Sequence, residues 1–289
     1  MRTISELPLR GAGGEPISFA RTVHSHGCAP LPPAILEPAP LVYKRSFRAA
    51  GRVIEVAMHE RDGRLIVQTV SSPGAAAARI EAAIARMFRF DADLSQFYAR
   101  IADDDDLGWA VRGAGRMLAS PTVFEDVVKT ICTTNCTWSA TVRMTTALSE
   151  LGGGAFPQPE ELMAASDAWY RDVAKMGYRG AYVRELARAV ASEELNLDAL
   201  LDPRRFDDQA VEQSLLALPG VGPYAAAHVM QLLGRHRQLV LDSWTRPKYR
   251  RLAGMKRAKD STIRRAFARY GEYAGLAFWL YLTRDWIEE

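Results

Sequence analysis

The residues with the clearest chemical potential are a glycine-containing hairpin and a single aspartate that follows it. The hairpin reads LPGVGPYAAAH over residues 218–228, and the aspartate is Asp242. Glycine permits positive φ angles and lets another molecule approach the backbone closely. Pro223 suits the first turn of a helix, because that position needs no N–H donor. Free N–H groups at the start of such a helix bind anions, so this turn predicts a site for a phosphodiester.

The segments around the hairpin have the spacing of helices. Apolar residues in 206–216 recur at helical intervals, and 225–233 is almost wholly apolar, which predicts a buried second helix. The sequence thus predicts helix, hairpin and helix over residues 207–233. Asp242 follows two apolar residues, and an acid in that position indicates chemistry. The alternative is a helix N-cap, because aspartate caps helices readily, but hairpin and spacing together favour the catalytic role.

Together, the hairpin and the aspartate resemble the helix-hairpin-helix superfamily of DNA base-excision glycosylases. The matching residues are Leu218-Pro219-Gly220-Val221-Gly222 and the aspartate of Val240-Leu241-Asp242, and the spacing from Tyr224 to Asp242 also fits. Segments 120–135, 176–183 and 270–277 resemble the subgroup that holds the alkylpurine (3-methyladenine) and 8-oxoguanine glycosylases. The resemblance covers most of the chain and is strongest from residue 120 to 285.

The resemblance implies a mechanism for Asp242. Loss of a base leaves positive charge on the sugar, and an ionised carboxylate can stabilise that charge and orient or deprotonate the attacking water. Bifunctional members of the superfamily have a lysine nucleophile at the position of Tyr224, and a phenol cannot form the imine that this lysine forms. We therefore expect a monofunctional hydrolase that leaves an intact abasic site.

A flipped-out base needs a pocket, and the resemblance implies which residues line it. The predicted lining consists of Tyr224, His228, Tyr273, Trp138 and Trp244. Aromatic faces suit a cationic alkylated base. For the two tryptophans, ordinary core packing is the favoured interpretation, and for His228 a satisfied core histidine. Asn135 matches the intercalating position of the family, and a helix-terminal asparagine is the equal alternative.

Positive charge is concentrated next to the hairpin. The chain has a net charge of only +3, but residues 235–269 contain 12 Lys or Arg residues and two acidic ones. Such a cluster suits a phosphate backbone, and a solvated helix face is the alternative. The residues predicted to contact DNA are Gly220, Val221, Gly222, Asn135, Arg246 and Lys248.

The sequence shows no spacing typical of a side-chain metal site, and no cofactor should be required. Its three cysteines are Cys28, Cys132 and Cys136, none in a CxxC pair, and small buried residues are the favoured interpretation of the last two. Some glycosylase branches carry a four-cysteine iron–sulfur cluster, which is not expected because no cysteine follows Cys136. The resemblance does imply a monovalent cation, Na⁺ or K⁺, on the backbone carbonyls of Leu216, Leu218 and Val221.

The expected fold is mainly α with a small N-terminal antiparallel β-sheet domain (α+β). Residues 1–16 look irregular, and strands are expected at 18–23, 41–47, 53–58 and 64–70. Helical patterns begin at residue 75, and one helix is expected to start at Pro121 with Ser120 as its cap. We expect a sheet domain over 1–75 and a helical glycosylase body over 76–289, with the catalytic cleft between helical subdomains.

These observations favour a monofunctional DNA glycosylase that removes damaged purines, in the first place alkylated ones, from double-stranded DNA in base excision repair. The alternatives are an oxidised-purine (8-oxoguanine-type) glycosylase and a non-catalytic helix-hairpin-helix DNA-binding protein. The composition, with 48% hydrophobic and 25% charged residues, is that of a globular protein. No apolar run is long enough to span a bilayer and the N-terminus lacks an apolar signal core, so a cytoplasmic protein is expected. We also expect a monomer.

Overall fold

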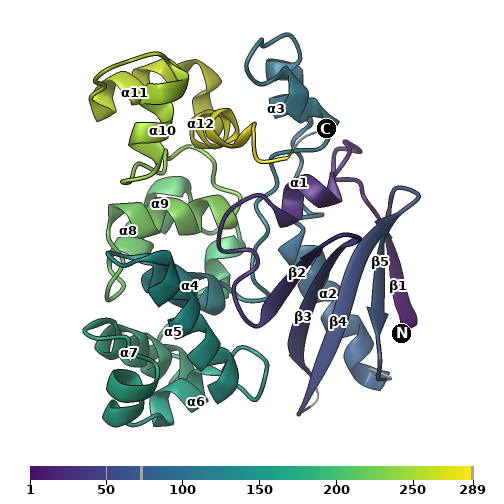
Figure 1. Cartoon of the computed structure of the whole chain (residues 1–289), viewed down its shortest axis with the longest axis vertical. Coiled ribbons are helices and arrows are strands. Elements are labelled where there is room, and N and C mark those ends of the chain that lie inside the picture. Colours follow the sequence, from purple (N-terminus) through teal and green to yellow (C-terminus); the bar gives the residue numbers. More distant parts are fainter. Residues whose placement is uncertain (50, 72–73, 288–289) are drawn as a thin grey trace.

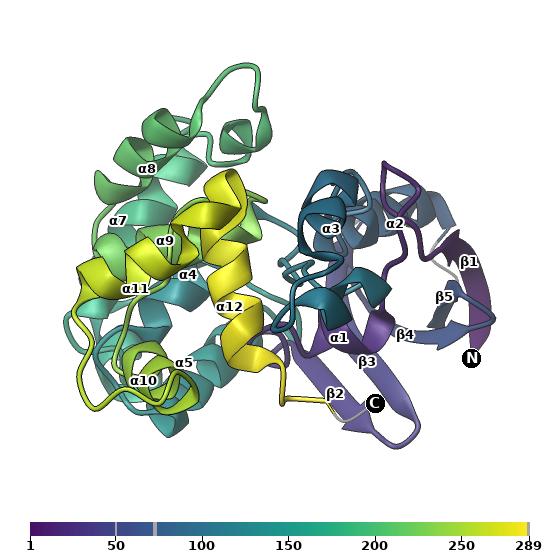
Figure 2. The same ribbon diagram turned by 90° about the horizontal axis from the view of Figure 1, so that it is seen from above.

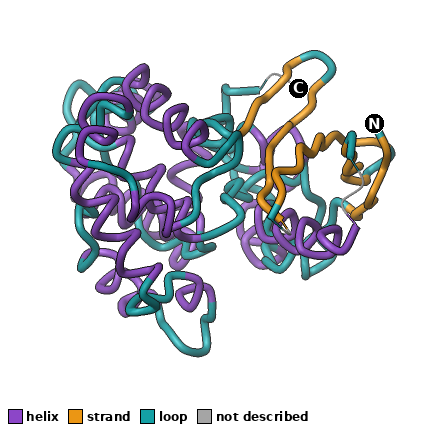
Figure 3. The backbone as a smooth tube through the Cα atoms, turned by 90° about the horizontal axis from the view of Figure 1, so that it is seen from below, coloured by secondary structure: helices purple, strands orange, loops and turns teal. Residues whose placement is uncertain are grey.

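The computed structural model describes residues 1–49, 51–71 and 74–287 of the chain. An antiparallel sheet lies on one side of the molecule, and helices form most of the rest (Figure 1, Figure 3). This arrangement confirms the predicted class, mainly α with a small N-terminal antiparallel sheet. Within the described residues, every helix is too short or too polar to cross a membrane.

The five-stranded sheet has the order β1-β5-β4-β3-β2, and each neighbouring pair is antiparallel. Its strands are β1 (Arg2–Pro8), β2 (Ala34–Pro38), β3 (Leu41–Ala49), β4 (Arg52–Arg61) and β5 (Arg64–Thr69). Between β4 and β5, the turn residues Asp62 and Gly63 have φ angles of 52° and 69°. Two positive φ angles give a turn whose twist matches that of the flanking strands, which explains the Asp-Gly pair.

Two expectations for the N-terminal segment are wrong. Residues 1–16 are not all irregular, because β1 pairs with β5, far along the chain. Residues 18–23 form helix α1 (Phe19–Val23) instead of a strand, with Phe19, Thr22 and Val23 buried. Ser18 caps this helix by accepting a hydrogen bond from the Arg21 N–H (3.2 Å). The cap and the burial of one helix face outweigh the β propensity of these residues.

The other helices follow the sheet in sequence. They are α2 (Ala77–Met87), α3 (Ser95–Ile101), α4 (Val123–Thr133), α5 (Trp138–Leu151), α6 (Pro159–Ala164), α7 (Arg179–Ala191), α8 (Asp208–Leu216), α9 (Pro223–Leu232), α10 (Thr245–Leu252), α11 (Asp260–Phe267) and α12 (Ala274–Thr283). Short 3₁₀ helices are η1 (Gly74–Ala76), η2 (Gly108–Arg112), η4 (Asp198–Leu201) and η5 (Ala268–Tyr273), and η3 (Trp169–Val173) is a π-helical turn. The helix expected to start at Pro121 begins at Val123, because Thr122 is the residue that caps it.

Buried apolar side chains form three large cores in the described part of the chain. Helix α2 packs on the sheet through Ile80 and Ile84, so the sheet's core continues past residue 75. A second core lies among helices α4 to α9, and a third around α3 and α10 to α12. A smaller cluster between them contains Val240 and Trp279. Figure 2 shows α12, the helix of Trp279, between the helical body and the elements next to the sheet.

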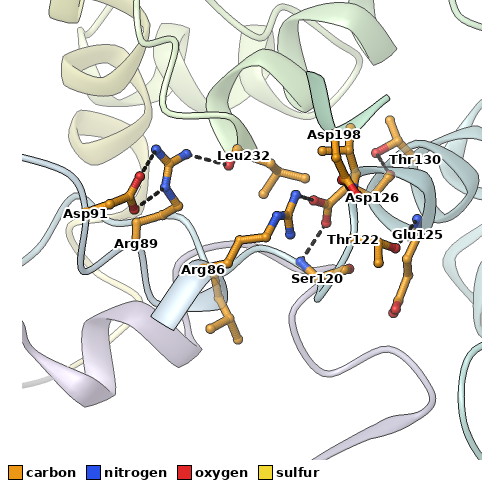
Figure 4. A network of polar contacts seen from close by, with 12 residues as sticks. Arg86, Arg89, Asp91, Ser120, Thr122, Glu125, Asp126, Thr130, Asp198 and Leu232 are labelled. Atoms are coloured by element: carbon orange, nitrogen blue, oxygen red, sulfur yellow. Dashed lines mark hydrogen bonds and ion pairs between the residues drawn. The ribbon is translucent and has the colours of Figure 1, made fainter. Parts of the chain in front are cut away.

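Buried ion pairs join the sheet side to helix α4 (Figure 4). Arg86 of α2 donates to one carboxylate oxygen of Asp126 (3.0 Å), and the other oxygen accepts from the Ser120 N–H (2.7 Å). Next to it, Glu125 pairs with Arg45 of β3. These charges are tolerated in the interior because each has an opposite partner. The contacts fix α4, and α4 in turn packs against α9 of the hairpin.

Candidate active site

The predicted helix, hairpin and helix are present, since α8 ends at Leu216 and α9 begins at Pro223. Gly220 has a φ angle of 77°, and a Cβ atom there would lie 2.6 Å from the ring of Tyr182, so glycine is needed. Gly222 is exposed, and a Cβ atom there would have no neighbour within 4 Å. This side of the turn is therefore open to another molecule.

The turn leaves donors and acceptors of the backbone unpaired. Among the residues that the structure describes, the N–H groups of Tyr224 and Ala225 find no hydrogen-bond acceptor. The carbonyl of Leu218 accepts from the Val221 N–H (3.2 Å), whereas those of Leu216 and Val221 accept nothing from the same residues. Free N–H groups suit a phosphate, and free carbonyls suit a monovalent cation. Two of the three carbonyls predicted to hold a cation, those of Leu216 and Val221, are free in this sense.

Asp242 lies in the loop between α9 and α10 and is half-buried. Its Oδ1 accepts hydrogen bonds from the N–H groups of Trp244 (2.8 Å) and Thr245 (2.6 Å). Its own N–H donates to Thr245 Oγ1 (2.8 Å), so aspartate and threonine cap the start of α10 reciprocally. Within the described chain, Oδ2 has no hydrogen-bond partner, and no lysine or arginine pairs with the carboxylate. Asp242 thus lies two residues before Trp244, the N-cap of α10, and one of its oxygens holds N–H groups at the start of that helix, while the other is available for chemistry.

Tyr224 occupies the first turn of α9. Its ring stacks on that of His228, with 6.2 Å between centroids, and its hydroxyl shares a hydrogen bond with Thr133 Oγ1 (3.3 Å). Burial, with a smaller contribution from the negative charge of Asp242, raises the pKa of Tyr224 to about 12. The phenol therefore stays protonated at neutral pH, and it lies close enough to feel the aspartate's charge.

His228 is buried, but it is not the satisfied core histidine that the sequence favours. Its Nε2 has no hydrogen-bond partner in the described part of the molecule. The ring packs edge-on against His26, at 5.4 Å between centroids, and against Trp279, at 6.5 Å. Burial lowers the pKa of His228 to about 3, so the imidazole is neutral.

Trp244 belongs to a cluster of three indoles that the sequence interpretation missed. The ring centroid of Trp244 lies 5.8 Å from that of Trp279 and 5.7 Å from that of Trp286. Trp279 packs in the cluster that Tyr224 also contacts, and its Nε1–H donates to the Ser25 carbonyl (2.7 Å). The cluster therefore connects Trp244, two residues after Asp242, with the Tyr224 side chain.

Core packing, the favoured interpretation of Trp138 and Trp244, is wrong for both. Trp138 is 50% exposed and Trp244 is 40% exposed. Trp138, at the start of α5, covers Gly27, where a Cβ atom would lie 3.5 Å from the indole. Asn135, three residues earlier, is exposed and has a φ angle of 45°, a conformation that asparagine tolerates. Two exposed side chains thus flank the turn between α4 and α5.

Tyr273 is the predicted pocket residue that the structure places elsewhere. Its ring lies 5.1 Å from Phe97 and 6.5 Å from His236, between centroids, in the core around α3 and α12. It lines a cavity of about 350 Å³ together with Arg89 and Asp208. This cavity contains none of the other predicted lining residues. The structure therefore brings together Tyr224, His228 and Trp244, and it does not bring Tyr273 to them.

The two predicted basic contacts have acidic partners within the protein. Arg246 makes a bidentate pair with Asp260 (2.8 and 2.9 Å) and stays partly exposed. Lys248 is 9% exposed and donates to Asp285 (2.8 Å), so the structure gives it an internal contact instead of the predicted external one. The exposed basic residues of this region that lack an ion pair within the described chain are Arg251, Lys256, Arg257, Lys259, Arg264 and Arg265.

The sequence matches no protein-family model and no curated protein, but solved structures share the fold. A 3-methyladenine DNA-glycosylase from Archaeoglobus fulgidus superposes with a TM-score of 0.71 at 19% identity, covering 98% of this chain and 99% of that one. An 8-oxoguanine glycosylase/lyase from Clostridium acetobutylicum gives 0.70 at 17% identity, covering 93% and 94%. A DNA-3-methyladenine glycosidase from Bacillus halodurans gives 0.54 at 23% identity, covering 66% and 89%. These are the two kinds of protein that the hairpin and the aspartate resemble, and the fold predicted from that resemblance is confirmed.

Proposed function

We propose that this protein is a DNA glycosylase that hydrolyses the N-glycosidic bond of a damaged base in double-stranded DNA. One observation carries the proposal: Asp242, which has one carboxylate oxygen without a partner, is close enough for its charge to raise the pKa of Tyr224, and Tyr224 follows a turn with unpaired N–H groups. Proteins of this fold support it. They include a Clostridium acetobutylicum 8-oxoguanine glycosylase/lyase in complex with double-stranded DNA and a Schizosaccharomyces pombe 3-methyladenine DNA glycosylase in complex with abasic DNA.

In this mechanism the turn binds the DNA backbone, and the aspartate acts at the sugar. Backbone N–H groups at the start of α9 hold a phosphate of the DNA strand without needing a positive side chain. The sugar at the scissile bond then gains positive charge as the base departs, and Asp242 Oδ2 stabilises it. The same oxygen orients or deprotonates the water that attacks the anomeric carbon. A Na⁺ or K⁺ ion on the carbonyls of Leu216, Leu218 and Val221 would stiffen the turn and add positive charge beside the phosphate.

We propose further that the enzyme is monofunctional and leaves an intact abasic site. A lyase step needs an amine that forms an imine with the sugar, and the residue at this place is Tyr224, a phenol. The protonated hydroxyl and its hydrogen bond to Thr133 give this side chain a role in shaping the site. On this proposal, the chain differs from a glycosylase/lyase such as the Clostridium protein in that it has no lyase step.

Alkylated purines are the substrate class that the aromatic surroundings favour. The rings of Tyr224 and His228 are stacked, which places two aromatic side chains side by side at the site. The faces of Trp244 and of its two indole neighbours attract such a base through cation–π interaction. An oxidised purine is the second candidate, because a protein that acts on 8-oxoguanine shares the fold with a TM-score of 0.70.

A panel of duplexes, each with one alkylated or oxidised base, tests the substrate. Base release is scored by cleavage of the resulting abasic sites with alkali. We expect release of alkylated purines above that of 8-oxoguanine, and an undamaged duplex serves as the baseline. Release of 8-oxoguanine alone would reassign the substrate class, and release of no base at all would leave a DNA-binding protein without catalysis.

Asp242→Asn tests the mechanism. The amide can still accept the two capping hydrogen bonds through its oxygen, so the start of α10 should be kept, whereas the negative charge is lost. We expect unchanged affinity for duplex DNA and a fall in the rate of base release of at least about 100-fold, the scale of losing one main electrostatic contribution. The measurements are single-turnover kinetics and a DNA-binding titration. Full activity in the variant would refute the role of Asp242.

A further inference from the structure

Two imidazoles and one thiol lie close together, and Tyr224 stacks on one of the two imidazoles. His26 and Cys28 come from the loop after α1, and His228 comes from α9. One ligand-type atom from each of the three lies within 4.8 Å of the others. We propose that His26, Cys28 and His228 bind a zinc ion. This site goes beyond the proposed cleavage of the glycosidic bond, in which none of these three residues binds a metal.

The nitrogen of His228 is the strongest sign of a missing ligand. His228 is 5% exposed, and its Nε2 has no hydrogen-bond partner among the described residues. A buried polar atom without a partner is uncommon in a folded protein, because leaving it unpaired costs free energy. A metal ion at this nitrogen would remove that cost.

His26 is held in the tautomer that ligation needs. A carbonyl can only accept, so the contact of His26 Nε2 with the Leu118 carbonyl (2.8 Å) places the proton on Nε2. Nδ1 is left with a lone pair, which at present accepts from the Cys28 N–H (3.2 Å). A histidine that ligates a metal through one nitrogen commonly donates from the other to a backbone carbonyl. The metal would replace only the longer of the two bonds.

Metal binding at this site would release a proton. A histidine binds a metal through the lone pair of a neutral imidazole, and a cysteine binds it as a thiolate, so the Cys28 thiol must lose its proton. Zn²⁺ would form a bond to this sulfur, and the thiol proton would pass to water. Lys129, which lines the same cavity as His26 and Cys28, is already paired with Glu125 (2.8 Å), and this reduces its repulsion of the ion.

The donor set selects the class of metal. Two nitrogens and one sulfur suit zinc, whereas magnesium and calcium prefer oxygen ligands. Three protein ligands leave a fourth position for water. With metal bonds of about 2.0 Å to nitrogen and about 2.3 Å to sulfur, the donor atoms must approach to about 3.5 Å from one another. The site is therefore close to its bound geometry, and the side chains must close by about 1 Å.

Zinc at this site would tie two distant parts of the chain together. The loop of His26 and Cys28 also carries Ser25, whose carbonyl holds Trp279 of α12. His228 belongs to the helix that starts at the hairpin. Zinc should therefore raise the thermal midpoint of the metal-free protein by several degrees, because the ion binds only the folded arrangement of its ligands.

The test starts from the full chain freed of metal with a chelator. Titration with Zn²⁺ against a chromophoric chelator should show one ion per chain, with a dissociation constant below about 1 μM. Cys28→Ser and His228→Asn should each weaken binding at least about 100-fold, since each removes one of three ligands. Cys136→Ser and His24→Gln are the matched controls, a thiol and an imidazole outside the site, and they should bind zinc like the wild type.

Two measurements on the wild type identify the ligands even if a variant fails to fold. Co²⁺ in place of zinc should give a sulfur-to-cobalt absorption band with the wild type, and the band should vanish in Cys28→Ser. Zinc should also protect Cys28, and not Cys136, from alkylation in the wild type, as read by mass spectrometry. Absence of stoichiometric zinc binding, equal binding by Cys28→Ser, or tight binding of Cu⁺ without zinc would overturn the proposal. None of these readouts depends on glycosylase activity.

Discussion

Asp242 shows how one carboxylate can hold the start of a helix and still be free for chemistry. Oδ1 accepts from the N–H groups of Trp244 and Thr245, and Oδ2 has no partner among the described residues. The capping bonds fix the plane of the carboxylate without neutralising its charge. Helix capping and catalysis are therefore compatible here, because the cap supplies the orientation that the chemistry needs.

The phenol at Tyr224 leads to a prediction about reaction intermediates. In the presence of borohydride and a damaged duplex, the wild type should form no covalent adduct with DNA, since no imine is available for reduction. The measurement is a denaturing gel of labelled DNA. Tyr224→Lys is the matched control, because it places an amine at the same position, and it should give a detectable adduct. An adduct with the wild type would show that another amine attacks the sugar.

At the residue scale, the sequence reveals the groups that lie in or near the hairpin and misses those brought in from elsewhere. Asp242 and Tyr224 are recognisable because their spacing from the two glycines is local. Trp279 and His26 carry no such signal, since each reaches the site through the fold. The bond from Trp279 to the Ser25 carbonyl spans 254 positions. Only the packing of α12 against that loop discloses the contact.

At the scale of the elements, the hairpin contains two glycines that have different roles. Gly220 is needed for folding, because its φ angle is 77° and a side chain would meet Tyr182. Gly222 has no neighbour that a Cβ atom would meet within 4 Å, and its φ angle of −96° is open to other residues. A substitution at Gly222 therefore tests binding without disturbing the fold.

Gly222→Asp should weaken DNA binding about tenfold or more, to damaged and undamaged duplexes alike. The added negative charge would lie where the N–H groups of the turn receive a phosphate. Gly222→Ala adds a side chain without charge and should bind close to the wild type. The measurement is a fluorescence-polarisation titration at fixed salt, with circular dichroism to verify folding. Equal affinity of both variants would contradict phosphate binding at this turn.

Elements with a strong local pattern are predictable, and those decided by distant partners are not. Helices α8 and α9 and the β4–β5 turn follow from periodicity and from an Asp-Gly pair. Strand β1 escapes prediction because only its pairing with β5 makes it a strand. Helix α1 escapes because a five-residue segment is too short to show a helical period, and Ser18 decides its start. The internal pairing of Lys248 with Asp285 has the same cause, a contact made only in the folded chain.

For the whole molecule, His236 links the loop of Asp242 to the body. Its carbonyl accepts from the Gly275 N–H of α12 (2.8 Å), and its ring stacks on Tyr273. Burial, with smaller contributions from Arg89 and Arg116, lowers the pKa of His236 to about 3. An unfolded histidine has a pKa of about 6.5, so between these values the unfolded chain takes up a proton that the folded one excludes. The stability contributed by His236 is complete above pH 6.5 and is lost as the pH falls toward 3.

His236→Gln should accordingly flatten the pH dependence of unfolding. Between pH 7 and pH 5, the free energy of unfolding should fall less in the variant than in the wild type, by on the order of 1 kcal/mol. Urea denaturation at several pH values measures it. His59→Gln on strand β4 is the control and should follow the wild type. Parallel curves for wild type and His236→Gln would rule out this histidine as the cause.

The cluster of Trp244, Trp279 and Trp286 also has a practical consequence. Half of the six tryptophans of the chain lie here, with ring centroids 5.7 to 6.1 Å apart, close to Asp242. Their ultraviolet emission is sensitive to any flat ring that approaches and to any change in water around Trp244. The molecule thus contains its own optical reporter, and arrival of a nucleobase can be timed by stopped flow without an attached dye.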